Sequence, residues 1–419
     1  MYEMEQIDER VILVGIDTGN EDAANRSLDE LSELAKTAKA AVVGRLIQPR
    51  ESAHPGTYIG KGKLTELKDL IWETDATGII CDDELTSAQL GNLEEELSCK
   101  IIDRTLLILD IFAARAVSGE GKIQVELAQL RYRASRLAGL GRSLSRLGGG
   151  IGTKGPGEKK LEMDRRLIRE RISRLKKELK DVEKHRELIR TQRKQSGLKV
   201  AALVGYTSAG KSSIENVLTN AGILEDAMLF STLDTTTRSL VLDNTQEILV
   251  TDTVGFIRKL PHHLVEAFKS TLEEAKYADI IIHVVDASNP QMDEQMHVVY
   301  DTLRQLGAAD RPVITLFNKQ DKLESAGSYR DFQAEYSIPA SAKTGEGLAE
   351  LKKALLEIVR REQIYVERLY DFSEASKIQL IRSRGQLLSE KYVPEGIEVK
   401  AYVPKDIYCL LYTSDAADE

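Results

Sequence analysis

The first 118 residues alternate between short apolar runs and segments with helical periodicity. The apolar, β-branched runs are Val11–Ile16, Ala41–Ile47, Gly78–Cys81 and Lys100–Ile102. Helical patterns fill the intervals between them, at Ser27–Thr37, Leu64–Thr74 and Ser87–Leu97. Strands that alternate with helices in this way favour a parallel sheet with helical crossovers. We therefore predict a small parallel α/β domain over residues 1–118.

The pattern changes to a longer helical period over residues 119–197. Apolar residues three or four positions apart follow one helix face from Ile123 to Leu137. After the glycine-rich segment Gly148–Gly157, an apolar residue recurs every seven positions from Leu161 to Ile189. Such a stripe is typical of a helix that packs along a partner helix. We predict a long antiparallel helical hairpin with a glycine-rich tip.

Strand–helix alternation returns at residue 198 and predicts a second α/β domain over residues 198–363. Its apolar runs are Val200–Val204, Ile248–Thr251, Ile280–Val285 and Val313–Phe317. Residues 364–406 form a smaller unit with a different pattern. Here we predict a strand, a helix and a strand, at Tyr365–Tyr370, Ser373–Tyr392 and Gly396–Val403. The fold class is therefore α/β, with a small α+β domain at the C-terminal end.

Composition narrows the class of protein. No run approaches the roughly 18 consecutive apolar residues of a membrane-spanning helix, and the first residues have no signal-peptide pattern. The three cysteines are too few for a disulfide framework or a multi-cysteine zinc site. We expect Cys81, within an apolar run, to be buried. We expect a cytoplasmic monomer without a membrane span.

The formal net charge of −9 conceals a basic block. Residues 131–198 hold 21 basic and 8 acidic residues, a net of +13, so that the rest of the chain carries −22. Residues 131–157 contain six basic residues and no acidic one. A basic block in an otherwise acidic chain points to a nucleic-acid partner for that part alone.

Residues 205–212 match the phosphate-binding motif G-x-x-x-x-G-K-[ST]. The motif follows the apolar run Val200–Val204 and precedes a helical pattern, Ser213–Leu218, which is the context that a phosphate-binding loop requires. Its glycines let backbone N–H groups close around phosphate oxygens. Lys211 would reach the β- and γ-phosphates, and the hydroxyl of Ser212 would ligate Mg²⁺.

Three further motifs follow in the order expected of a Ras-like GTPase. Asp-Thr-Val-Gly at Asp252–Gly255 offers a carboxylate for Mg²⁺, through water, and a glycine N–H that senses the γ-phosphate. Asn-Lys-Gln-Asp at Asn318–Asp321 offers a carboxylate that accepts hydrogen bonds from guanine N1–H and the 2-amino group. Ser341–Lys343 fits the segment that contacts the guanine carbonyl. Ligand sites are expected at the carboxyl ends of parallel strands. The alternatives are an ATPase or an inactive fold.

Two features bear on hydrolysis. The segment Phe230–Arg238 offers four threonines that could close over Mg²⁺ and the γ-phosphate, at positions 232, 235, 236 and 237, and the residues alone do not choose among them. Many GTPases follow the Asp-x-x-Gly motif with a glutamine that orients the attacking water. Here the residue is Phe256, which cannot do so. We therefore expect slow intrinsic hydrolysis, with a docked partner or another residue of this chain supplying the missing group.

Four segments outside the generic GTPase motifs carry a family resemblance. They are Tyr58–Leu64, Asp103–Arg115, Gln124–Gln129 and Gly148–Glu158. With the loop Gly205–Lys211 and the segment 230–238, they make residues 10–403 resemble the HflX-type GTPases, a family of translation-associated, ribosome-binding GTPases. The resemblance implies GTP/GDP and Mg²⁺ as cofactors and the large ribosomal subunit as partner. It implies ribosome-stimulated hydrolysis of GTP, splitting or rescue of stalled ribosomes, and ATP binding or hydrolysis in the N-terminal region. Association with ribosomes or peripherally with membranes also follows.

The resemblance also assigns site residues. The Mg²⁺ ligands are Ser212 and Thr232, and the catalytic set is Lys211, Thr232, Asp252 and Gly255. The expected nucleotide contacts are Gly205, Tyr206, Thr207, Ser208, Ala209, Gly210, Lys211, Ser212, Phe230, Ser231, Thr232, Leu233, Asp234, Asp252, Thr253, Val254, Gly255, Asn318, Lys319, Gln320, Asp321, Ser341, Ala342 and Lys343.

Three departures from the family pattern stand out. Ser208 replaces an asparagine that helps to hold potassium in related GTPases, which puts potassium stimulation in doubt. Thr235 replaces a usual proline and would loosen the switch. The end of the chain does not resemble a family C-terminus, so we expect the C-terminal domain to be truncated after about Asp406, with residues 407–419 a non-native or disordered tail.

Arg142, Arg146 and Lys154 lie near the predicted tip of the hairpin and are our candidates for RNA contact. Phosphate contact is the expected mode, because only one aromatic residue is interspersed. The basic residues of 158–198 are explained as well by the solvated face of a helix. Gly60-Lys61-Gly62 is either a phosphate or RNA contact or a turn that opens the next helix, and the pair His262-His263 favours a surface or capping role over a metal site.

Three functions fit these features. The first is a GTPase that acts on the large ribosomal subunit. The second is an RNA-remodelling or ribosome-assembly GTPase that acts on free RNA, for which no modifying-enzyme motif is visible. The third is a non-catalytic adaptor that GTP merely stabilises, against which the intact Lys211, Asp252 and Asp321 argue.

Overall fold

A computed structural model describes residues 9–147, 156–219, 229–230, 236–243, 246–259, 269–323 and 329–413. Side chains are described for these residues except 138–147, 156–161, 192–196, 243, 269–272 and 412–413. By its internal contacts the chain forms two compact units. The first comprises residues 1–182 with 227–234 and 258–269, and the second comprises 183–226, 235–257 and 270–419.

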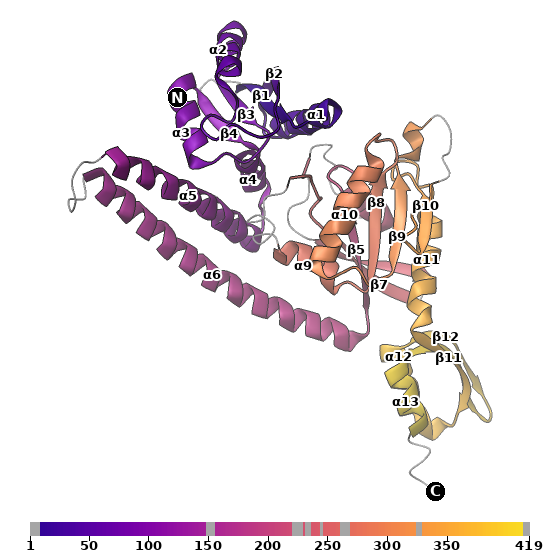
Figure 1. Ribbon diagram of the computed structural model, residues 1–419. Helices are drawn as coiled ribbons and strands as arrows, with labels where there is room; N and C mark the ends of the chain where they lie inside the picture. The colour runs from indigo at the N-terminus through magenta and orange to yellow at the C-terminus, as the bar shows by residue number, and fades with distance from the viewer. Residues whose placement is uncertain are drawn as a thin grey trace, which may run out of the picture. The chain divides into compact units, whose positions relative to one another are not determined.

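The first unit begins with a four-stranded parallel sheet in the order β2-β1-β3-β4 (Figure 1). Its elements are β1 (Arg10–Asp17), α1 (Glu21–Thr37), β2 (Ala41–Pro49), α2 (Lys61–Thr74), β3 (Gly78–Cys81), α3 (Ser87–Leu97), β4 (Lys100–Asp103) and α4 (Arg104–Arg115). The predicted parallel α/β fold is confirmed.

Local signals explain where these helices begin. The Asn20 side chain caps α1 by accepting from the N–H of Ala23, so the helix starts six residues before the predicted Ser27. Thr86 and Gln89 form a capping box at the start of α3. Gly60 is the N-terminal cap of α2, which confirms that Gly60-Lys61-Gly62 opens a helix. Cys81 is fully buried, as predicted.

The hairpin is formed by α5 (Gly119–Leu147) and α6 (Pro156–Ser196). The Nε and Nη2 atoms of the Arg171 guanidinium on α6 donate to the Glu126 carboxylate on α5, at 2.6 and 2.7 Å. This ion pair joins the two helices. Leu175, at the centre of the seven-residue stripe, is buried. The hydroxyl of Tyr132 on α5 donates to Asp103 at 2.8 Å, which attaches α5 to the end of β4. The glycine-rich tip at 148–155 lies outside the described residues.

The second unit contains a six-stranded sheet in the order β10-β9-β8-β5-β7-β6. Its elements are β5 (Lys199–Gly205), α7 (Lys211–Thr219), β6 (Thr236–Asp243), β7 (Gln246–Asp252), α9 (Lys269–Tyr277), β8 (Ile280–Asp286), α10 (Met292–Leu306), β9 (Val313–Asn318), η1 (Gln320–Lys322), β10 (Tyr336–Pro339) and α11 (Leu348–Arg361). Five strands are parallel, and the unpredicted β6 is antiparallel to β7.

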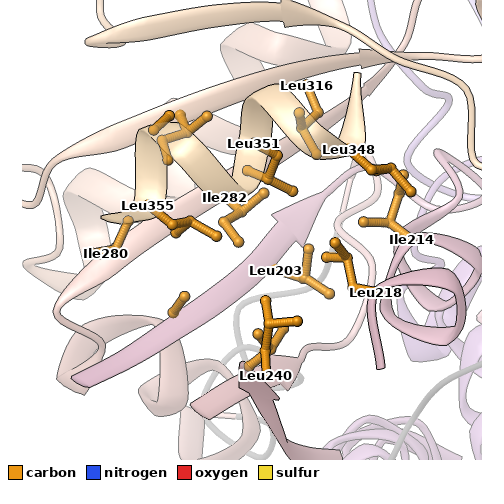
Figure 2. Close-up of a cluster of buried hydrophobic side chains, with 14 of the residues drawn as sticks. Leu203, Ile214, Leu218, Leu240, Ile280, Ile282, Leu316, Leu348, Leu351 and Leu355 are labelled. Carbon is orange, nitrogen blue, oxygen red and sulfur yellow. The ribbon is translucent and has the colours of Figure 1, made fainter. Parts of the chain in front are cut away.

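Apolar side chains from strands and helices close one face of this sheet. Figure 2 shows Leu203 of β5 and Ile282 of β8 among leucines of α11, with Leu240 of β6 in the same cluster. Ile214 and Leu218 anchor α7 in that cluster, each 5 % exposed or less. Burial of this kind fixes the helix that follows the phosphate-binding loop, and so positions the loop itself.

The C-terminal part is a three-stranded antiparallel sheet in the order β11-β13-β12. It contains β11 (Gln363–Tyr370), η2 (Phe372–Glu374), α12 (Ala375–Arg384), β12 (Gln386–Val393), β13 (Gly396–Pro404) and α13 (Lys405–Thr413). The small α+β domain is confirmed, but the predicted helix over Ser373–Tyr392 is wrong in its second half. Gly385 ends α12 in an extended conformation, and 386–393 then pair with β13.

The end of the chain also differs from the predicted tail. Residues 405–413 are helical, and Ile407 and Leu411 are fully buried in the C-terminal core. The prediction of disorder is therefore wrong for 407–413, because an apolar helix face packs there, while a non-native origin stays a prediction and 414–419 lie outside the described residues. In the part of the chain described, no helix is both long and apolar enough to cross a membrane.

Candidate nucleotide-binding site

The loop between β5 and α7 can be formed only with glycine at two positions. Gly205 and Gly210 have φ angles of +156° and +95°. A Cβ at Gly205 would lie 2.2 Å from the carbonyl oxygen of Val284, and one at Gly210 would lie 2.3 Å from the Asn318 Nδ2. The sequence motif is thus a steric requirement of this turn.

Lys211, the first residue of α7, lies inside the loop with 7 % of its surface exposed. Its Nζ donates to the carbonyl oxygens of Tyr206, at 3.0 Å, and Gly205, at 3.3 Å. Burial lowers the pKa of its ammonium to about 8, against the opposing effect of the Asp252 carboxylate. The ammonium is held where the loop would present it to phosphate oxygens.

Ser212 and Asp252 bring two oxygen donors together. The Ser212 hydroxyl donates to the Asp252 Oδ2 at 2.8 Å. Asp252 ends β7 and is 1 % exposed. A hydroxyl and a carboxylate are hard oxygen ligands of the kind that Mg²⁺ prefers, so this donor pair fits the predicted metal. The third predicted participant, Thr232, lies outside the described residues, as do Ser231, Leu233 and Asp234.

The Asp-Thr-Val-Gly segment lies directly against the phosphate-binding loop. The Thr207 N–H donates to the Phe256 carbonyl at 2.8 Å, and the Phe256 N–H donates to the Gly205 carbonyl at 3.1 Å. A Cβ at Gly255 would lie 2.9 Å from the Cα of Thr207. The Phe256 side chain is 2 % exposed and packs in a hydrophobic cluster. It therefore points into the core.

Asn318 connects the base-recognition motif to the phosphate loop. Its Nδ2 donates to the Ala209 carbonyl at 2.8 Å, and its Oδ1 accepts from the N–H of Ala342 at 3.0 Å. Lys319 donates to the Ser208 carbonyl at 2.8 Å and to Asp286 at 2.7 Å. Asn318 and Lys319 thus connect three segments that we expect to contact the nucleotide, namely 205–212, 318–321 and 341–343.

Asp321 is exposed and faces the Ser341–Lys343 segment. Its Oδ1 accepts from the Ser341 hydroxyl at 2.7 Å, and this hydrogen bond lowers the pKa of the carboxyl. Asp321 is therefore held as a carboxylate, the form that accepts hydrogen bonds from guanine. Gln320 and Asp321 are the first two residues of the short helix η1.

Two of the four candidate switch threonines have other partners. The Thr236 hydroxyl donates to both carboxylate oxygens of Glu215, at 2.8 and 3.1 Å. The hydroxyls of Thr237 and Thr251 are 3.0 Å apart. Glu215 belongs to no sequence motif, and nothing in its local pattern marks a buried acid. Burial raises the pKa of its carboxyl to about 7, and the Thr236 hydrogen bond opposes the shift.

The RNA candidates are only partly visible. Arg142 and Arg146 lie on α5, but the structure does not describe their side chains, and Lys154 lies outside the described residues. The pair His262-His263 also lies outside the described residues. Several cations of the basic block bind within the chain. Besides Arg171, Arg190 of α6 donates to Glu274 at 2.6 Å and stacks 4.1 Å above the Tyr277 ring.

Three family models match consecutive parts of the chain. Residues 25–113 match a GTP-binding GTPase N-terminal region, 115–193 match a GTP-binding GTPase middle region, and 200–319 match a model described as a 50S ribosome-binding GTPase.

Relatives match along nearly the whole chain. The chain is 62 % identical over 418 residues to a protein named GTPase HflX from Lacrimispora saccharolytica, covering 100 % of this chain and 98 % of that one. It is 38 % identical over 409 residues to GTPase HflX of Escherichia coli, covering 97 % and 93 %. A solved structure, that of SsGBP with GDP, is 25 % identical, covers 84 % of this chain and 99 % of its own, and has a TM-score of 0.48.

Proposed function

Since the chain belongs to the HflX family of GTPases, we propose that it binds the large ribosomal subunit and hydrolyses GTP there, splitting or rescuing stalled ribosomes. The observation that carries this proposal is a GTPase site whose Phe256 is buried in the core, on the same chain as a basic helical hairpin. Because Phe256 cannot orient the attacking water, hydrolysis needs a stimulating partner. The basic hairpin is suited to binding RNA.

The chain's own residues account for nucleotide binding. The backbone of residues 205–210 and the ammonium of Lys211 would hold the phosphates, while Asp321 would select guanine. Ser212, with Thr232 and, through water, Asp252, would hold Mg²⁺. When bound, that ion supplies neutralisation of charge on the β- and γ-phosphates. The N–H of Gly255, beside Lys211, would report whether a γ-phosphate is present.

We expect the partner to stimulate hydrolysis because no glutamine follows the Asp252–Gly255 motif. In GTPases one residue orients the attacking water, and a transition-state-stabilising group supplied by a partner raises kcat by about 10³–10⁵. Phe256 occupies the usual glutamine position and its side chain lies in the core. Intrinsic turnover is therefore slow, and a docked ribosome supplies or orders the missing group.

The hairpin is the proposed RNA-binding element. The acid-free stretch 131–157 would meet the negative phosphates of ribosomal RNA, with Arg142, Arg146 and Lys154 at the point of contact. The division into residues 1–118, 119–197, 198–363 and 364–406 is part of the same proposal, with the hairpin as a separate functional module. ATP binding in the N-terminal region stays a prediction of the resemblance. That region contains no second G-x-x-x-x-G-K-[ST] motif.

Cosedimentation with ribosomes tests the proposal. The full chain is spun with 70S ribosomes and with separated subunits, in GTP, a non-hydrolysable GTP analogue, or GDP. We expect comigration with the large subunit, or loss of 70S particles, with the triphosphates only. Equal binding in GDP would favour the adaptor function, and binding to protein-free RNA as strong as to subunits would favour the RNA-remodelling function.

A further inference from the structure

The C-terminal sheet has one covered face and one open face. The helices α12 and α13 pack on the covered face, over a core that contains Val366, Val399 and Ala401 (Figure 1). Side chains alternate between the two faces of a strand. The open face therefore carries the residues between the buried positions, which are Tyr365, Glu367 and Leu369 of β11 and Glu398, Lys400 and Tyr402 of β13. Tyr365 and Leu369 are 45 % and 46 % exposed.

Two tyrosines form a pair on this open face. Tyr365 is directly opposite the half-buried Tyr402 in the register of β11 and β13, and their ring centroids are 5.3 Å apart. The guanidinium of Arg360, near the end of α11, lies 5.0 Å from the centroid of the Tyr402 ring. The Glu367 carboxylate accepts from the Tyr365 hydroxyl at 2.8 Å and forms an ion pair with Lys400 at 2.5 Å. Both rings are therefore held in place, with a cation near each.

The side chains of the open face suit unpaired bases better than an apolar protein surface. The cores of protein–protein interfaces are depleted in lysine and glutamate, yet Glu367 and Lys400 lie in the middle of this face, beside Glu398. Aromatic rings, in contrast, offer faces on which any base can stack. Cations beside the rings can contact the phosphates that join such bases.

The order of the elements favours the same ligand. β11, α12, β12 and β13 follow the order β-α-β-β with which the ferredoxin-like motif begins, and β13 lies between the other two strands. The RNA recognition motif stacks two or three bases on aromatic side chains of its sheet. A shared topology alone does not make a binding site. Here, however, the tyrosine pair lies on the central strand and its neighbour, with cations beside it.

We propose that the open face of β11 and β13 binds single-stranded RNA, with Tyr365 and Tyr402 as the rings on which bases stack. Arg360 and Lys400 would contact the phosphates. We expect little sequence preference, because stacking does not depend on the hydrogen-bonding edge of the base. This surface is distinct from the hairpin residues proposed above for RNA contact, and its RNA binding does not require the ribosomal function.

Binding of a fluorescein-labelled oligouridylate of about eight nucleotides to the full chain tests this proposal. Fluorescence anisotropy measures the Kd at one salt concentration, with GDP present. Tyr365→Leu and Tyr402→Leu each remove one ring but keep an apolar side chain, and Tyr365→Phe keeps the ring. Tyr277→Leu is the matched control. Tyr277, at the end of α9, is 44 % exposed and has the Arg190 guanidinium 4.1 Å from its ring centroid, but it does not belong to the C-terminal sheet.

We expect the Kd to rise about tenfold in Tyr365→Leu and in Tyr402→Leu, the scale of one lost stacking contact with a base. Tyr365→Phe and Tyr277→Leu should keep the Kd of the parent chain. Affinity for an RNA duplex of the same length should be equal in Tyr365→Leu and the parent, because paired bases already stack on each other. The Tm of every variant is measured to confirm that it is folded.

Crosslinking of the unmodified chain gives a second outcome that needs no variant. The same oligouridylate with 4-thiouridine is irradiated with the full chain, and mass spectrometry identifies the crosslinked peptides. We expect crosslinks in 363–370 and 396–404. Crosslinks confined to other segments, the hairpin included, would overturn the proposal, and so would an equal rise of Kd in Tyr277→Leu. An unchanged Kd in both folded leucine variants would also overturn it and would favour a protein partner for this face.

Discussion

The Ser212 hydroxyl donates to the Oδ2 of Asp252 across 40 positions of sequence, at 2.8 Å. Ser212 lies at the start of α7, which follows β5, and Asp252 ends β7, the strand that pairs with β5 in the sheet. The fold thus assembles a hydroxyl and a carboxylate at one point, which is the donor pair that our account assigns to Mg²⁺.

A change at this pair should appear as a changed metal requirement. Asp252→Asn removes the charge but keeps the shape, so we expect the Mg²⁺ concentration for half-maximal GTP hydrolysis to rise by at least about tenfold. The measurement is a Mg²⁺ titration of turnover. Asp301→Asn, at an exposed ion pair on α10, serves as control. An unshifted midpoint in Asp252→Asn would remove Asp252 from the metal site.

Nucleotide affinity should fall at alkaline pH because of Lys211. Burial places the pKa of its ammonium at about 8 without nucleotide, and phosphates raise it on binding because they favour the charged form. Binding therefore takes up a proton above pH 8. We expect the Kd for GDP to be nearly constant from pH 7 to 8 and then to rise, by up to about tenfold per pH unit.

Fluorescence titrations with a labelled GDP between pH 7 and 9.5 would measure this dependence. Lys211→Arg should bind more weakly at pH 7 but show a flat profile, because the guanidinium stays charged. A parent chain whose affinity does not change up to pH 9.5 would contradict the lowered pKa.

The preference for guanine over other bases should depend on Asp321. The carboxylate accepts from the N1–H and 2-amino group of guanine, and Asp321→Asn replaces one acceptor by a donor. We expect GDP affinity to fall about 100-fold, on the scale of two lost hydrogen bonds to a charged group, and xanthosine diphosphate to become the better ligand. Competition binding with both nucleotides measures the ratio, and an unchanged preference for guanine would move base recognition to other residues.

The Arg190–Glu274 ion pair should contribute to the free energy of unfolding, whereas an exposed ion pair on the same helix, α6, should contribute little. Both side chains are mostly buried, with 16 % and 11 % exposed, and Arg190 also stacks on Tyr277. Arg190→Ala should lower the free energy of unfolding by about 2 kcal/mol, because it leaves Glu274 buried without its cation. Arg166→Ala, at an exposed i,i+4 pair, should change it by less than about 0.5 kcal/mol. Urea denaturation monitored by circular dichroism measures the free energy of unfolding of both variants. Equal losses in the two would contradict a stabilising role for the Arg190–Glu274 pair.

The parts of the site that sequence predicts are those in which chemistry and geometry demand the same residue. Gly205 and Gly210 are fixed by steric contacts, Lys211 by phosphate and Asp321 by guanine, so a motif reveals them. The buried acid Glu215 could not be predicted in this way, because Thr236, its hydrogen-bond partner, is 21 positions away in sequence. Its local sequence is that of an ordinary helix.

The errors in secondary structure have similar causes. The segment Phe230–Arg238 is interpreted through its threonines as a switch, but its last three residues begin the strand β6, which β-branched residues favour. The helix predicted over Ser373–Tyr392 is interrupted at Gly385, where α12 ends and the chain turns to pair with β13. The net charge of residues 131–198 follows from composition, but composition cannot show that Arg171 and Arg190 have carboxylate partners inside the chain.

GTP turnover in the presence of purified large ribosomal subunits tests the proposed ribosomal function. Turnover by the full chain is measured alone, with large subunits, with small subunits and with protein-free ribosomal RNA. Our account predicts at least a tenfold rise with large subunits, as expected when a partner completes a GTPase site, and a much smaller rise with the other two. No rise with large subunits, or an equal rise with naked RNA, would contradict it.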